Sequence, residues 1–167
     1  MGDPALTARI MVSADPANPL LAERRVNPHN RAHLQRIIEF LEQHLRALPE
    51  GDSELRALLL TKLAGKYYGD PSERGRQAAA DAMAIAERIE LSPEARVEVQ
   101  IAAHTQAFCV PGKLGERAAV AAELVELART HHLVASERLG LLWQIYTTER
   151  RGDLTAVAAA IDELARH

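Results

Sequence analysis

Apolar residues recur at steps of three and four along most of this chain, which is the spacing of one face of an α-helix. The clearest run predicts a helix that opens at Asn27-Pro28 and stops at Pro49-Glu50-Gly51. Its apolar positions form a single stripe made of Leu34, Ile37, Ile38, Leu41, Leu45 and Leu48. We therefore expect an amphipathic helix with one face in a core.

The same spacing predicts one short helix before this run and six after it. The short helix covers Asp3 to Ala14, and an irregular connection from Asp15 to Val26 follows it. Later helices are opened by a helix-capping serine at Ser53, Ser92 and Ser136. Glycine-containing breaks fall at Gly69-Asp70, Pro111-Gly112 with Gly115, and Gly152-Asp153. At Asp70-Pro71-Ser72-Glu73 we expect a capping-box variant, with Glu73 reaching back to the helix start.

Both series repeat at a period of roughly 40 residues, and each repeat holds an apolar helix, a break and an alanine-rich helix. Stacked helix pairs show this pattern, because each pair buries its apolar face only against its neighbour. The sequence thus predicts an all-α fold, a right-handed αα-hairpin solenoid that is TPR-like, with about eight helices in four pairs. The alanines predicted to lie between adjacent helices are Ala78, Ala79, Ala82, Ala86, Ala118, Ala121, Ala122, Ala128, Ala156, Ala159 and Ala160.

We expect residues 1–167 to form a single TPR-like helical-repeat domain that is a fragment of a longer multidomain protein. The last predicted helix carries a stripe of Leu154, Val157, Ile161 and Leu164 that another repeat would ordinarily cover. If it is exposed, this C-terminal helix could also support a homodimer.

Composition supports the helical prediction and argues against two classes of function, nucleic-acid binding and membrane insertion. Hydrophobic residues make up 47% of the chain but aromatic residues only 4%, so leucine and alanine must build the core. The formal charge of -3 argues against direct nucleic-acid binding. Arg150-Arg151 is too short a run to change that and is expected to be solvated. One cysteine, Cys109, and no apolar run of ~20 residues favour a cytoplasmic location without membrane insertion.

The sequence motifs predict no catalytic residue, no cofactor and no metal site. Gly112-Lys113 resembles part of a phosphate loop, but Leu114 replaces the required Ser or Thr. His29 and His33 have a metal-ligand spacing without a third ligand. Cys109 has no nearby base to activate it. We therefore expect a non-enzymatic protein.

A polar ladder is the best sequence candidate for a binding site. A shift of roughly 42 residues aligns Lys62, His104 and Tyr146 on the first helices of successive pairs. Such helices line the concave side of a solenoid, so these residues would form a ligand-contacting strip with Gln100, Gln144 and Thr148. The simpler alternative, which these residue types favour, is that His104 is a hydrogen-bonded core residue and Tyr146 a core aromatic.

Several segments resemble a known family. Residues 48–64, residues 116–128, His132-Leu-Val-Ala and Gly152-Asp-Leu are similar to the carboxyl-terminal helical-repeat region of large actinobacterial transcriptional regulators, with a weaker likeness at residues 2–9. These are the SARP and AfsR-like antibiotic-regulatory proteins and the large LuxR-type regulators. In them, the repeats follow a DNA-binding domain and a nucleotide-binding switch domain, and sense a signal or hold the switch inactive.

The resemblance implies an interaction or sensor domain of a bacterial transcriptional regulator. Its partner would be another protein or the adjacent switch domain of the same polypeptide. The alternative is a receptor domain that binds a small-molecule effector in a pocket between helix pairs.

Overall fold

The computed structural model describes residues 28–108 and 110–166. Within these ranges the secondary structure consists of seven α-helices and no strand, which confirms the all-α prediction. The predicted helix at residues 3–14 and the connection at residues 15–26 lie outside the described ranges. The chain divides into two compact units between Gln106 and Ala107. The expectation of a single repeat domain stays a prediction.

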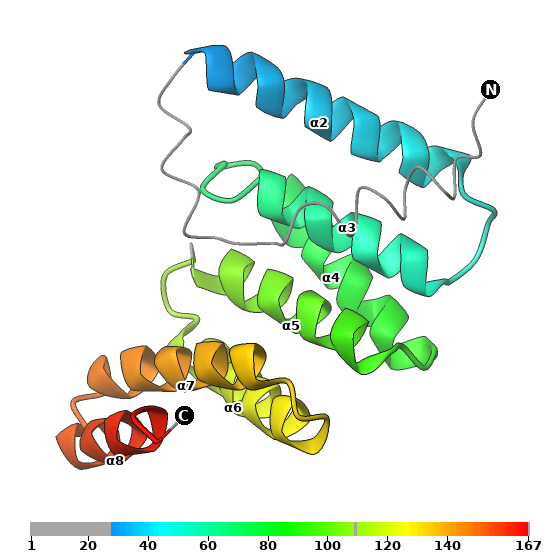
Figure 1. Cartoon of the computed structure of the whole chain (residues 1–167). Helices are drawn as coiled ribbons and strands as arrows, with labels where there is room; N and C mark the ends of the chain where they lie inside the picture. The colour runs from blue at the N-terminus through cyan, green and yellow to red at the C-terminus, as the bar shows by residue number, and fades with distance from the viewer. Residues whose placement is uncertain (1–27, 109, 167) are drawn as a thin grey trace. The chain divides into compact units, whose positions relative to one another are not determined.

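In the first unit, the second helix, α3 (Glu54–Lys66), packs against the helices before and after it (Figure 1). The helices of this unit are α2 (Pro28–Ala47), α3, α4 (Arg74–Arg88) and α5 (Pro93–Phe108), the last two residues of α5 belonging to the second unit. Helix α3 packs against both α2 and α4. Its side chains are buried on almost every side from Ala57 to Ala64, including Leu59, which is 1% exposed. The central position of α3 explains why its apolar surface is wider than one stripe.

Small residues let the helices of the first unit approach closely. Ala78, Ala79, Ala82 and Ala86 of α4 are all buried, as predicted. A Cβ atom added at Gly75 would lie 2.8 Å from the Cβ of Tyr67 and 2.8 Å from Oε1 of Gln106. Close packing of α4 therefore requires glycine at position 75.

Hydrogen bonds join both ends of α5 to α3. The Gln106 side chain donates from Nε2 to the backbone oxygen of Ala64 at 2.7 Å, at the end of α3. At the start of α5, the backbone N–H of Ser92 donates to Oε2 of Glu54 at 2.6 Å. The Gln106 side chain is buried, so its bond to Ala64 satisfies a polar group inside the unit.

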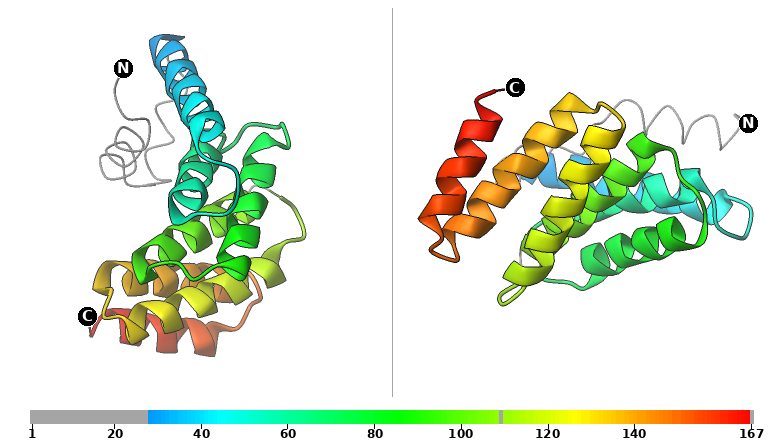
Figure 2. Two further views of the ribbon diagram at one scale, coloured as in Figure 1. Left: turned by 90° about the vertical axis from the view of Figure 1, so that its right-hand side faces the viewer. Right: turned by 90° about the horizontal axis from the view of Figure 1, so that it is seen from below.

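The second unit contains α6 (Leu114–Thr130), α7 (Val134–Glu149) and α8 (Leu154–Leu164), preceded by the end of α5. Helix α7 packs against both α6 and α8, and Figure 2 shows the three helices side by side in chain order. Ala121, Leu124 and Ala128 of α6 are fully buried. Ala122 on α6 and Ala159 on α8, by contrast, are exposed, so the alanine prediction is wrong at these two positions.

One arginine links all three helices of the second unit. Arg129, near the end of α6, donates from Nε to Oε1 of Glu137 on α7 at 2.8 Å, and it also pairs with Glu163 on α8. The hydrogen bond that Arg129 donates to Glu137 is the largest influence that raises the pKa of Arg129. This network orients α8 against α7.

Most predicted helix boundaries are confirmed. Ser53 accepts a hydrogen bond from the backbone N–H of Arg56 at 3.2 Å, and Ser92 accepts one from Ala95 at 3.3 Å. Asp153 caps α8 in the same way. The breaks at Gly69, Gly112 and Gly152 have φ angles of 72°, 81° and 79°, which favour glycine.

Two predicted boundaries are wrong. Ser136 lies inside α7, which begins at Val134, because His132 turns the chain with a φ of 57° and the carbonyl of Leu133 then accepts the N–H groups of Ser136 and Glu137. Glu73 does not complete a capping box. Its carboxylate pairs with Arg76 instead, although the Asp70 side chain does accept the N–H of Ser72 as expected.

The two serines allow a matched test of helix capping. Replacing Ser53 by alanine should lower the free energy of unfolding by about 1 kcal/mol, because the N–H of Arg56 loses its acceptor. Replacing Ser136 by alanine should change it by less than about 0.5 kcal/mol, because Ser136 caps nothing. Urea unfolding of both variants makes the comparison, and equal losses would contradict this assignment of helix starts.

Candidate functional site

Three of the predicted strip residues belong to the first unit, and all three are buried. Lys62 on α3 is 4% exposed, and Gln100 and His104 on α5 are 5% and 2% exposed. The Nζ atom of Lys62 lies 3.4 Å from Oε2 of Glu98, so α3 and α5 are also joined by an ion pair. Burial of this kind fits the simpler interpretation of polar groups in a core. The proposed role in ligand contact stays a prediction.

The other three strip residues, Gln144, Tyr146 and Thr148, lie on α7 in the second unit and are half-buried. The hydroxyl of Thr148 donates to the backbone oxygen of Gln144 at 2.6 Å, so it is engaged within its own helix. Tyr146, in contrast, contacts an aromatic ring and two arginine side chains. Its ring lies 5.5 Å from that of Phe108, between centroids, and two arginines stack on it.

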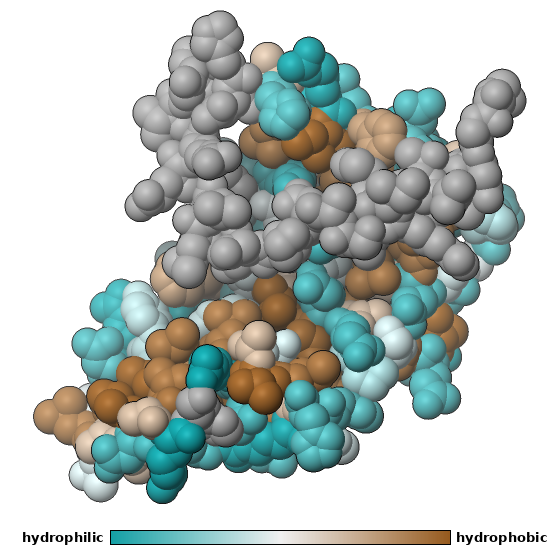
Figure 3. Space-filling view, in the orientation of Figure 1, coloured by the Kyte–Doolittle hydropathy of each residue, from teal (hydrophilic) through white to brown (hydrophobic). Residues whose placement is uncertain are grey.

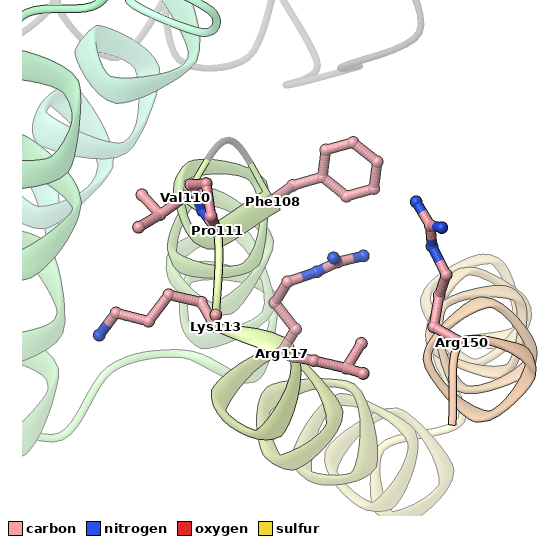
Figure 4. Close-up of a pocket in the computed structure, with 8 residues that line it drawn as sticks. Phe108, Val110, Pro111, Lys113, Arg117 and Arg150 are labelled. Carbon is pink, nitrogen blue, oxygen red and sulfur yellow. The ribbon is translucent and has the colours of Figure 1, made fainter. Parts of the chain in front are cut away.

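A pocket of about 370 Å³ lies beside this aromatic pair. It is lined by the end of α5, by the connection at residues 110–113, by the start of α6 and by Arg150 immediately after α7. Figure 4 shows the Arg117 side chain beneath the Phe108 ring and Arg150 reaching toward the same space, whereas Lys113 extends away from it. All lining residues belong to the second unit.

The guanidinium group of Arg117 lies over the ring of Phe108 and near that of Tyr146. Its central carbon lies 4.3 Å from the centroid of Phe108 and 5.3 Å from that of Tyr146, and the residue is only 8% exposed. The corresponding carbon of Arg150 lies 5.6 Å from the centroid of Tyr146. Stacking of this kind stabilises a cation and restricts its rotamers. The pocket therefore contains a preorganised positive charge.

A second candidate surface is the outer face of α8. No residue of α8 is buried, although the helix is mostly apolar. Four exposed apolar residues, Leu154, Ala158 and Ile161 of α8 and its C-cap residue Ala165, are spaced by four, three and four residues, so they share one helix face. Leu154 is 72% and Ile161 49% exposed, and Leu142 on α7 is 50% exposed. We call Leu154, Ala158, Ile161 and Ala165 the α8 stripe.

Figure 3 shows brown, hydrophobic side chains gathered over α7 and α8. Two residues of the predicted stripe on α8, Val157 and Leu164, are instead half-buried, because that side of the helix faces α7. The predicted stripe therefore combined residues from two sides of α8. Val157 and Leu164 lie on the side packed against α7, and Leu154 and Ile161 lie on the exposed side.

Tyr67 has a perturbed pKa, and its contacts join three helices of the first unit. Its hydroxyl donates to Oε1 of Glu42 at 3.1 Å, and the guanidinium of Arg74 lies 4.6 Å from its ring centroid. Burial, followed by the hydrogen bond to Glu42, raises the pKa of Tyr67 to about 12. The phenol is neutral at pH 7 and ties the end of α3 to α2 and α4.

The described residues contain neither a metal-binding cluster nor a membrane-spanning helix. No group of three His, Cys, Asp or Glu side chains within these ranges is placed to hold a metal ion. No helix in the same part of the chain combines the length and the apolar character needed to cross a bilayer. Cys109, which we interpreted as an inert thiol, lies outside the described residues.

Sequence reasoning missed the arginine and aromatic cluster of the second unit. Phe108, at the end of α5, is 42% exposed and was not recognised as part of a site. Arg150 is exposed, as expected, but its position over the Tyr146 ring was not predicted, and Arg117 was not singled out. The available signal was the turn at Pro111-Gly112-Lys113, which brings the end of one helix next to the start of another.

Comparison with protein-family models, with curated proteins and with solved structures found no match to this chain.

Proposed function

We propose that this chain is a non-enzymatic, TPR-like protein-interaction or sensor domain that binds a protein partner through the α8 stripe. The single observation that carries the proposal is the exposure of Leu154 and Ile161 on a helix that buries none of its residues. Contiguous exposed apolar side chains are costly in water and are typical of interaction surfaces. A partner that covers them would gain the free energy of their removal from water.

The architecture supports this reading. Helix α7 pairs with α6 on one side and α8 on the other, with connections of only a few residues, as helical repeats do. Close contacts at small residues such as Ala121 and Gly140 allow this packing. In a TPR-like solenoid, successive hairpins would continue the same packing and present their outer faces to partners.

The family resemblance supplies the biological context of the proposal. By analogy with the helical repeats of large actinobacterial regulators, the domain would serve a bacterial transcriptional regulator and bind another protein or the adjacent switch domain of its own polypeptide. Binding would shift the switch domain between its two states only if this domain has a different affinity for each of those states. A homodimer through the same α8 stripe is a further partner of this class.

A second candidate function is a receptor for a small-molecule effector. The pocket beside Arg117 favours it, because its volume lies within the range of small-ligand sites and its lining includes one aromatic side chain, Phe108, and a buried arginine. This function does not depend on the α8 stripe.

Site-specific photo-crosslinking in the cells that carry the gene tests the interaction proposal. A photoreactive phenylalanine analogue at position 161 should yield a discrete adduct with one protein, because Ile161 lies at the centre of the α8 stripe. The matched control is the same analogue at position 122, since Ala122 is exposed on α6 of the same unit. No adduct at position 161, or the same adducts at both positions, would refute the proposal.

A further inference from the structure

Helix α8 is attached to the second unit less tightly than α6 and α7 are attached to each other. Leu124 of α6 and Leu141 of α7 are fully buried. Gly140 of α7 lies so close to Val125 of α6 that no Cβ atom fits between them. Helix α8, in contrast, contains no buried residue. The buried side chains in the described part of this unit therefore all lie outside α8.

The apolar contact that holds α8 in place is small. On the side that faces α7, Val157 and Leu164 are only half-buried, and Ala156 and Ala160 contribute little more than a methyl group each. The helix has 11 residues, which is too short for a helix that is stable by itself in water. Helix α8 therefore depends on its contact with α7, and it loses its structure when that contact opens.

The Arg129 network supplies the other part of this attachment. Its guanidinium pairs with Glu137 of α7 and with Glu163 of α8, and its Nη1 atom lies 3.6 Å from Oε1 of Glu126 on its own helix. One cation therefore serves three carboxylates, which leaves an excess of negative charge. The side chain of Glu163 is more exposed than that of Glu137, so water and salt screen the pair with α8 more strongly.

The electrostatic cost of opening α8 is low. When α8 leaves, Arg129 keeps its hydrogen bond to Glu137, so the α6–α7 hairpin loses no ion pair of its own. The carboxylate of Glu163 moves into water, where it is well solvated. Its departure also reduces the repulsion among the carboxylates gathered around Arg129. The hairpin therefore has no polar group that requires α8 to stay in place.

We propose that α8 is a releasable segment, which leaves α7 and unfolds while the α6–α7 hairpin stays folded, and that the ion pair between Arg129 and Glu163 controls how often it opens. Opening exposes Val157 and Leu164 in addition to the α8 stripe, so the docked and open states present different apolar surfaces. A molecule that binds one state more tightly shifts the balance between them. The inference does not require that the α8 stripe binds a partner, so its failure and that of the proposed function are distinguishable.

Backbone hydrogen exchange of the full chain, resolved by residue, tests whether α8 opens by itself. Amides in the middle of α8, at residues 158–161, should exchange at least about a hundredfold faster than those of Leu124 in α6 and Leu141 in α7, because opening of α8 exposes less apolar surface than unfolding of the hairpin. The middle of the helix is chosen because its last turn frays in any case. Equal protection of all three helices would show that α8 opens only together with the hairpin and would overturn the proposal.

Neighbouring acidic residues provide a matched pair of charge reversals. Glu163→Lys places a cation against Arg129, so it should raise the exchange rates in α8 about tenfold and change those in α6 and α7 less than about twofold. Asp162→Lys makes the same change of charge one residue away, at an exposed position outside the network, and should change the rates in α8 less than about twofold. Both lysines lie in the last turn and interact similarly with the helix dipole, so the difference isolates the ion pair. Equal increases in the two variants would refute control by this pair.

Discussion

Replacing Leu59 by alanine should lower the free energy of unfolding of the first unit by about 2–5 kcal/mol. Leu59 is 1% exposed and lies on α3, the helix that packs against both α2 and α4. The substitution removes buried apolar surface and leaves a cavity that neighbours from several helices cannot easily fill. Urea or thermal unfolding followed by circular dichroism measures the loss.

The control for this prediction is the corresponding substitution at an exposed leucine. Leu154→Ala, at a position that is 72% exposed, should change the free energy of unfolding by less than about 0.5 kcal/mol. This pair also separates stability from binding, because Leu154 belongs to the α8 stripe. If both variants lost the same stability, the assignment of α3 to the centre of a core would be wrong.

Replacing Gly140 by alanine should destabilise the second unit by about 1–3 kcal/mol, although alanine is the better helix former. The added Cβ would lie 2.7 Å from Cγ2 of Val125 and 3.3 Å from its backbone nitrogen. Val125 is 2% exposed and β-branched, so its side chain cannot easily rotate away. Helices α6 and α7 would have to separate by a few tenths of an ångström.

A second glycine and a double mutant complete this experiment. Gly115→Ala on α6 has no atom within 4 Å of the new Cβ, so it should leave the stability unchanged or raise it by up to about 1 kcal/mol. In a double-mutant cycle, Val125→Ala should relieve part of the loss caused by Gly140→Ala, because the shortest contact disappears. Strictly additive losses would show that this contact does not limit the approach of the helices.

Local signals in the sequence were sufficient to predict most of the fold. The spacing of apolar residues identified every described helix, and Ser53, Ser92 and Asp153 marked helix starts because a side-chain oxygen near free N–H groups acts within a few residues. Ser136 failed as a signal. The turn at His132 places the helix start two residues earlier, and a cap residue cannot compete once the backbone is already helical.

Packing between helices was less predictable. Gly75 and Gly140 were not recognised as contact points, because glycine in a helix normally indicates weakness and only the neighbouring helix reveals its function. The pocket at Arg117 was missed for a similar reason. Arg117 and Tyr146 lie far apart in the sequence, so no periodic pattern connects them. The predicted strip followed the repeat period instead, and it selected buried residues such as His104.

The central proposal for this chain is that a protein partner covers the α8 stripe. Its most direct test is the affinity of the partner captured by crosslinking for the full chain, measured with wild type, Ile161→Asp and Ala122→Asp. Ile161→Asp should weaken binding by at least about tenfold, because it places a charge at the centre of the interface, and Ala122→Asp should weaken it less than about twofold. Equal affinities of all three proteins for the partner would contradict the account.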